Sequence, residues 1–141
     1  MKIDNRIIVI LNITIPLVIG ALIYYLLSPE VIFVKLIDGV IQGGTHFTGA
    51  VENNVLISFI RFYFLDMLWG YALVFALYFI LDDNSAKLKK IFIVAFLFSA
   101  FIETLHLTPY VKGTFDCLVI LFELLSEVIA AFIINILMRR H

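Results

Sequence analysis

The sequence is poor in charged residues, proline and cysteine. Charged side chains make up 15% of its 141 residues, with three prolines and the single cysteine Cys117. Soluble domains carry about a quarter charged residues, so water is a poor solvent for this chain. The net charge of −1 provides no basic surface and argues against a nucleic-acid partner. A lone cysteine excludes an internal disulfide framework and a cysteine-based metal site.

Apolar residues are abundant instead: 63% of the chain is hydrophobic and the mean hydropathy is +1.09. A bilayer core is crossed by about 20 apolar residues of helix, and four stretches reach or approach that length: 7–27, 57–81, 91–107 and 117–138. The first is longer than the apolar part of a signal peptide and lacks a small-x-small cleavage site, which favours a retained helix. The sequence predicts a single all-α transmembrane domain over residues 1–141.

The distribution of Lys and Arg predicts the orientation of these four spans. Seven of these residues lie at the N-terminus, in the connection after the second span, and at the C-terminus, whereas Lys35, Arg61 and Lys112 lie on the other side. Cytoplasmic loops carry the positive excess. We therefore expect both termini in the cytoplasm.

Residues 31–41 are apolar but cover only about half a span. They predict either an interfacial helix, with Lys35 and Asp38 toward water, or a re-entrant segment. The expected fold is a bundle of four transmembrane helices, with this short helix between the first two.

Ionisable residues inside the predicted spans are the main functional signal. Each costs about 2.5–3.5 kcal/mol at mid-membrane if it faces lipid, so they are expected to face one another, a wet cavity or a bound polar group. Asp66, Glu103 and Glu123 fall at similar depths on three different spans, which predicts one acidic pocket open to the outer side. The candidate ligand-binding residues are Arg61, Asp66, Trp69, Glu103, His106, Asp116, Glu123 and Glu127.

Several of these candidates have simpler interpretations. Arg61 is interpretable as a snorkelling anchor rather than a ligand-binding residue. Asp66 is interpretable as part of an interface anchor with Arg61 as its counter-ion. Glu127 fits either the pocket or a hydrogen bond to a neighbouring helix through Ser126 or Asn135.

Metal binding is the other possibility that the carboxylates raise. A Glu-x-x-His pattern from two helices is typical of di-iron bundles, but here Glu103-Thr-Leu-His106 supplies it once. We predict neither a metal nor a cofactor.

Three stretches resemble a known family. They are 12–20 with Tyr24-Tyr25; the Arg61-x-x-x-x-Asp66-x-x-Trp69-x-Tyr-Ala-Leu73 pattern; and Glu103-x-x-His106 followed by Gly113-Thr114-Phe115-Asp116 and Glu123. In these the chain is similar to the VanZ-like family, small bacterial membrane proteins named for a teicoplanin-resistance protein. His106 replaces the usual Gln, and Val119 stands where a second Asp commonly follows.

The resemblance implies a multi-pass protein of the bacterial cytoplasmic membrane, with a cell-envelope role in tolerance of teicoplanin-type glycopeptides. The leading expectation is a non-enzymatic protein whose pocket binds a lipid headgroup, a lipid-linked envelope molecule or a lipopeptide. One alternative is an intramembrane enzyme that modifies an envelope lipid by carboxylate acid/base chemistry.

A third hypothesis is an accessory subunit of a larger membrane complex, or a homo-oligomer. Small residues such as Gly70, Ala72 and Ala76 would let another helix approach closely. The same residues would serve equally well inside the bundle.

Overall fold

Helices make up all the regular structure in the described residues of the computed structural model, which are 3–28, 32–41, 54–81, 85–108 and 115–139. The all-α prediction is confirmed for these ranges. In chain order the elements are α1 (Ile3–Leu27), α2 (Ile32–Ile41), α4 (Val55–Phe59), the π-helical η1 (Ile60–Phe64), α5 (Leu65–Leu81), α6 (Ser85–Leu105) and α7 (Cys117–Arg139).

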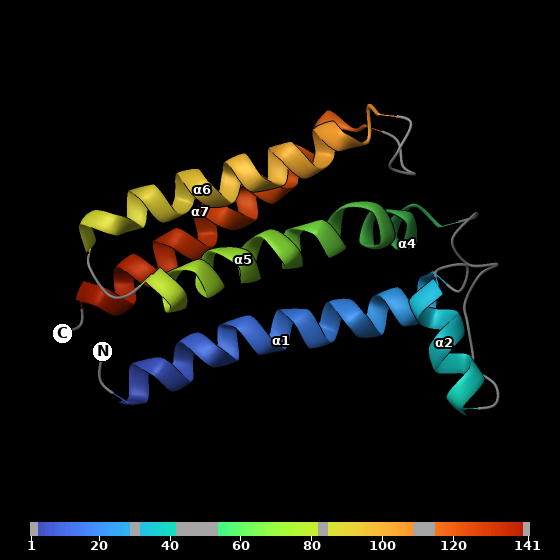
Figure 1. Cartoon of the computed structure of the whole chain (residues 1–141), viewed down its shortest axis with the longest axis horizontal. Coiled ribbons are helices and arrows are strands. Elements are labelled where there is room, and N and C mark those ends of the chain that lie inside the picture. Colours follow the sequence, from blue (N-terminus) through green and yellow to red (C-terminus); the bar gives the residue numbers. More distant parts are fainter. Residues whose placement is uncertain (1–2, 29–31, 42–53, 82–84, 109–114, 140–141) are drawn as a thin grey trace.

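Four long helical rods form the bundle: α1, the continuous α4–η1–α5, α6 and α7 (Figure 1). Successive rods run in opposite directions, so α1 begins and α7 ends at the same end of the bundle (Figure 1). We call the half near that end the closed half. The half where α6 ends and α7 begins is called the open half.

Three of the described helices are long and apolar enough to cross a membrane: Arg6–Leu27, Val55–Leu81 and Cys117–Leu137. They match three of the four predicted spans, and their large apolar side chains are extensively exposed on the outside of the bundle. The fourth prediction corresponds to α6. Helix α6 has several lysines near its start and Glu103 near its end. It is not among the three helices that are apolar enough to cross a membrane by composition.

Three helical rods begin earlier than the sequence predicts, and one of them is α1, which begins at Ile3 rather than residue 7. Asn54 caps α4 because its side-chain oxygen accepts the Leu56 N–H at 2.9 Å, an arrangement that satisfies a backbone donor at a helix start. Helix α6 begins at Ser85 rather than residue 91. The lysines assigned to a connection are thus helical, as Lys is a good helix former.

Helix α1 continues through Pro16. Proline removes one backbone donor from a helix interior, which membrane helices tolerate when nearby polar groups compensate. The carbonyl that loses its donor is that of Asn12, four residues back. Two side chains just before Pro16 bond to other carbonyls of the helix: Asn12 Nδ2 donates to the Ile8 carbonyl at 2.8 Å, and Thr14 Oγ1 to the Ile10 carbonyl at 2.9 Å. Asn12 also accepts a hydrogen bond from Tyr71 of α5 at 2.5 Å, which ties the two helices together.

The apolar core fills the closed half. Its fully or nearly buried members come from all four rods: Val9, Val74, Phe75, Tyr78, Ile91, Ala95, Ala130 and Ile134. Each lies in the part of its helix nearest the end where α1 begins. The bundle is therefore held together mainly at that end.

Helix α2 confirms that the predicted short helix exists. It lies at the far end of α1 and runs across the direction of the rods (Figure 1). Lys35 is exposed, as expected. Asp38 is not directed wholly to water: it is half-buried and accepts a hydrogen bond from the Tyr25 hydroxyl at 2.8 Å, because α2 folds back against the end of α1.

The π-helical turn η1 interrupts the second rod. The Leu65 N–H bonds to the Ile60 carbonyl, five residues back, whereas an α-helix spans four. Such turns are rare and often occur at functional sites. Here it contains Arg61 and ends two residues before Asp66; both are predicted site residues.

Candidate functional site

A cavity of about 690 Å³ occupies the open half, between the second rod, α6 and α7. Its wall is formed by apolar, polar and acidic residues from η1, α5, α6 and α7, together with the residue after α6 and the residue before α7. They are Phe62, Tyr63, Asp66, Trp69, Gly70, Leu73, Phe98, Ser99, Ile102, Glu103, His106, Asp116, Val119 and Glu123. Acidic groups from three rods thus face one space.

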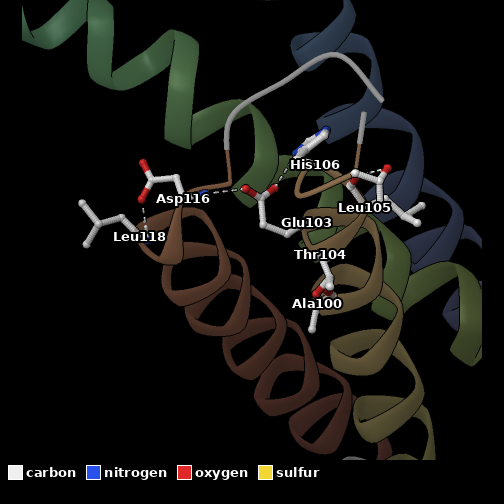
Figure 2. Close-up of polar contacts among 8 residues, drawn as sticks. Ala100, Glu103, Thr104, Leu105, His106, Asp116 and Leu118 are labelled. Atoms are coloured by element: carbon white, nitrogen blue, oxygen red, sulfur yellow. Dashed lines mark hydrogen bonds and ion pairs between the residues drawn. The ribbon is translucent and has the colours of Figure 1, made fainter. Parts of the chain in front are cut away.

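Glu103 connects the end of α6 to the start of α7. Its side chain is only 5% exposed. Oε1 accepts the backbone N–H of Asp116 at 2.8 Å, and Oε2 lies 3.2 Å from His106 Nδ1 (Figure 2). Both carboxylate oxygens therefore have partners, and the second partner is an imidazole that can donate or accept a proton.

Asp116 has a structural role as well as a place in the wall. Its Oδ1 accepts the Leu118 N–H at 2.8 Å, which makes it the N-terminal cap of α7. Its Oδ2 accepts the Tyr63 hydroxyl at 3.0 Å, which fixes η1 against α7. Tyr63 was not predicted as a site residue; no charge or spacing in the sequence pointed to it.

Asp66 and Glu123 supply two more carboxyl groups to the wall. Each lies close enough to Glu103, and to the other, for electrostatic interaction. No hydrogen bond of the Asp66 carboxylate to a described residue is present. Like charges around one space repel one another and attract a cation.

Glu127 lies behind this wall rather than in it. It is 0% exposed, and its Oε1 accepts the hydroxyl of Ser99 at 3.0 Å. Its predicted partners were Ser126 and Asn135; the observed one comes from α6 instead, because Ser126 donates to the Glu123 carbonyl at 2.7 Å. Among the described residues, Glu127 Oε2 has no hydrogen-bond partner.

Gly70 allows α5 and α7 to approach closely beside these acids. A Cβ at this position would lie 3.0 Å from Ser126 Oγ, 3.4 Å from the Glu123 carbonyl oxygen and 3.5 Å from Glu127 Cγ. The predicted close approach of helices at small residues is thus used inside the bundle at this position.

Arg61 does not join the acidic cavity. It lines a second cavity, of about 390 Å³, between α1 and the second rod. Within the described chain no carboxylate lies in ion-pair range of its guanidinium, so the counter-ion interpretation of Arg61 and Asp66 is not observed. The π-helical turn gives these two residues a different relative direction from that of a regular helix.

The structure brings six of the eight predicted residues to one cavity and leaves Arg61 and Glu127 outside its wall. In the described residues, no group of three or more His, Cys, Asp or Glu side chains has an arrangement that could hold a metal ion.

Together, these features describe a helical bundle with three helices long and apolar enough to cross a membrane, and an acidic cavity in one half. No protein-family model, curated protein or solved structure matches the chain.

Proposed function

We propose that this chain is a VanZ-like protein of the bacterial cytoplasmic membrane. In this proposal α6 is the fourth span, both termini are cytoplasmic, and the open half faces the outer leaflet. The positive-inside distribution of Lys and Arg supports the orientation. The exposed residues Lys89 and Lys90, at the start of α6, are at the closed end of the bundle.

The proposed function is to bind the polar headgroup of a lipid, or the cationic part of a lipopeptide, in the acidic cavity. One observation carries it: Asp66, Glu103 and Glu123, from three different helices, line the same space of about 690 Å³. A volume of this size suits a headgroup or a small ligand. The surrounding carboxylates favour a ligand with positive charge.

A contribution to tolerance of teicoplanin-type glycopeptides follows from the family proposal. Binding or shielding an envelope lipid in the outer leaflet would alter the surface on which a lipoglycopeptide acts. No covalent chemistry is required for that effect.

The test combines two substitutions in a strain whose teicoplanin tolerance depends on this protein. Asp66→Asn and Glu103→Gln remove charge with little change in volume, and we expect both to lower tolerance. Thr104→Val is the matched control, because Thr104 is exposed on α6 and bonds only to the Ala100 carbonyl of its own helix. Unchanged tolerance in the acidic variants at equal protein abundance would refute the site.

The orientation can be tested separately with Cys117, which is exposed at the open end of α7. A membrane-impermeant thiol reagent applied to intact cells should label it. In a Cys117→Ser background, Lys89→Cys at the opposite end should stay unlabelled until the cells are opened. The reverse pattern would place the cavity on the cytoplasmic side and exclude an outer-leaflet role.

One contact favours an enzyme as the second candidate. His106 Nδ1 and Glu103 Oε2, 3.2 Å apart, form a pair of the kind that transfers protons in general acid–base catalysis. Turnover of a lipid-linked envelope precursor by the purified protein, lost in Glu103→Gln, would favour this function over simple binding.

A further inference from the structure

The second cavity differs from the first in its lining. On the α1 side it is apolar except for Tyr24, with Pro16, Leu17, Gly20 and Ala21. There is free space beside Gly20, where a Cβ would come no closer than 3.9 Å to a neighbouring side chain. Its charged groups are Arg61 and Asp66.

The two cavities meet on α5. Both are lined by Asp66 and Trp69, and Trp69 is 61% exposed. A ligand bound in the second cavity would therefore contact residues that also line the acidic cavity. At that shared wall a carboxylate lies beside a wide apolar ring.

Arg61 is the unusual group in the second cavity. It is half-buried, it has no carboxylate partner among the described residues, and its guanidinium carbon lies 5.4 Å from the centre of the Phe62 ring. A partly buried cation is stabilised by an anion that returns the lost solvation. The guanidinium fork matches the oxygens of a phosphate group.

We propose that Arg61 binds the phosphate of a phospholipid whose acyl chain lies along the apolar groove beside α1, and whose headgroup amine meets Asp66 at the shared wall. The ligand class is an aminophospholipid. The phosphate site at Arg61 is new, whereas the amine site rests on the proposed function of the acidic cavity.

The charges select this class over other membrane lipids. A glycerol headgroup carries the phosphate but would place hydroxyl groups, without positive charge, against Asp66. A choline headgroup carries the positive charge but has no N–H to donate to a carboxylate. A free phosphate ion would leave the apolar wall of α1 without a ligand.

Trp69 provides the measurement, because it is the single tryptophan of the chain. The full chain is reconstituted in vesicles of unlabelled choline lipid with a minor fraction of one lipid that has brominated acyl chains, which quench a nearby tryptophan. We expect brominated ethanolamine lipid to quench more strongly than brominated choline or glycerol lipid with the same chains. Equal quenching by all three would overturn the proposal.

Substitutions then test the phosphate contact and the amine contact of the ligand one at a time. Arg61→Gln should lower the relative association constant of the ethanolamine lipid about tenfold, as expected for loss of a charge-assisted contact, and Arg61→Lys should restore part of it. Asp66→Asn should remove the preference for ethanolamine over glycerol. Lys35→Gln, at an exposed cation on α2, is the control and should match the unsubstituted protein.

The outcomes distinguish this inference from the proposed function. If Asp66→Asn and Glu103→Gln change lipid preference but Arg61→Gln does not, the phosphate site is wrong and the acidic cavity stands. If Arg61→Gln weakens binding while the acidic variants change neither lipid preference nor tolerance, the phosphate site stands. The aminophospholipid assignment and the proposed function then both fail.

Discussion

The two halves of the bundle are built from the same helices and use them in opposite ways. In the closed half, Val9, Phe75 and Ile134 meet in a core with almost no exposed surface. In the open half three of these rods, the second rod, α6 and α7, enclose a cavity of about 690 Å³ with carboxyl groups on its wall. The closed half holds the helices together, and the open half leaves space for a ligand.

This difference shows where the stability of the fold is expected to reside. Membrane helices associate through close packing and interhelical hydrogen bonds, since lipid removes the hydrophobic drive between them. Packing is dense in the closed half. In the open half the helices are joined by hydrogen bonds, from the Asp116 N–H to Glu103 and from the Tyr63 hydroxyl to Asp116, and by contacts of the Phe59 and Tyr63 rings with Phe122.

The largest contrast is expected from the same substitution made in each half. Phe75→Ala removes a fully buried ring and should lower the free energy of unfolding by about 3 kcal/mol, the usual cost of a large core cavity. Phe62→Ala, at the cavity wall where the ring is half exposed, should cost less than about 1 kcal/mol. Unfolding in mixed micelles measures both. Equal losses would mean that the closed half is not the stabilising one.

The buried pair of Ser99 and Glu127 sharpens the comparison, since it lies at the boundary between the halves. Ser99→Ala leaves both oxygens of a fully buried carboxyl without a described partner and should cost about 1–3 kcal/mol. The double variant Ser99→Ala with Glu127→Leu should recover that loss, because no buried polar group then remains. If the double variant is less stable than Ser99→Ala alone, Glu127 stabilises the fold through contacts other than this pair.

Gly70 tests how tightly the boundary between α5 and α7 is packed. Ala is the better helix former by about 1 kcal/mol, but overpacking typically costs about 1–3 kcal/mol, and a Cβ would lie 3.0 Å from Ser126 Oγ. Gly70→Ala should therefore be destabilising by about 1 kcal/mol overall, and adding Ser126→Ala should relieve it. Gly20→Ala, where the nearest side-chain atom would be 3.9 Å away, should instead be neutral or stabilising. The opposite ranking of the two glycines would refute the close contact.

The smallest effect is expected at the contact that joins α1 to α5. Tyr71→Phe removes the hydrogen bond to Asn12 and should cost about 0.6 kcal/mol, the average for such bonds between membrane helices. Tyr24→Phe is the control, because no hydrogen bond of the Tyr24 hydroxyl to a described residue is present. The thermal midpoint in detergent is sensitive enough to rank the two.

Much of this arrangement was predictable from the sequence because the energetic constraint is strong. Carboxylates within apolar spans avoid lipid, so Asp66, Glu103 and Glu123 had to be directed inward, and three helices of similar length placed them at similar depth. The spans themselves were predicted by the length of the apolar stretches. Neither argument determined the residue at which α6 begins, because lysines that flank a membrane helix fit a helix as well as a loop.

The hydrogen bonds that could not be predicted from the sequence depend on which individual side chains meet. Tyr63 is one of many aromatic residues, and its bond to Asp116 depends on the path of the second rod through η1. The choice of Ser99 over Ser126 as the partner of Glu127 depends on how α6 is rotated against α7. Neither helical periodicity nor charge determines such a rotation.

The π-helical turn makes the second rod a helix with one residue more than a regular geometry would hold. A residue adds about 100° of rotation in an α-helix, so the stretch before Ile60 and the stretch after Phe64 are out of phase by roughly one such step. A single helical wheel drawn through 55–81 therefore assigns one of these stretches to the wrong side. Deleting one residue within η1 would bring the two stretches back into phase and swing Val55–Phe59 around the rod, while Leu65–Leu81 kept its neighbours.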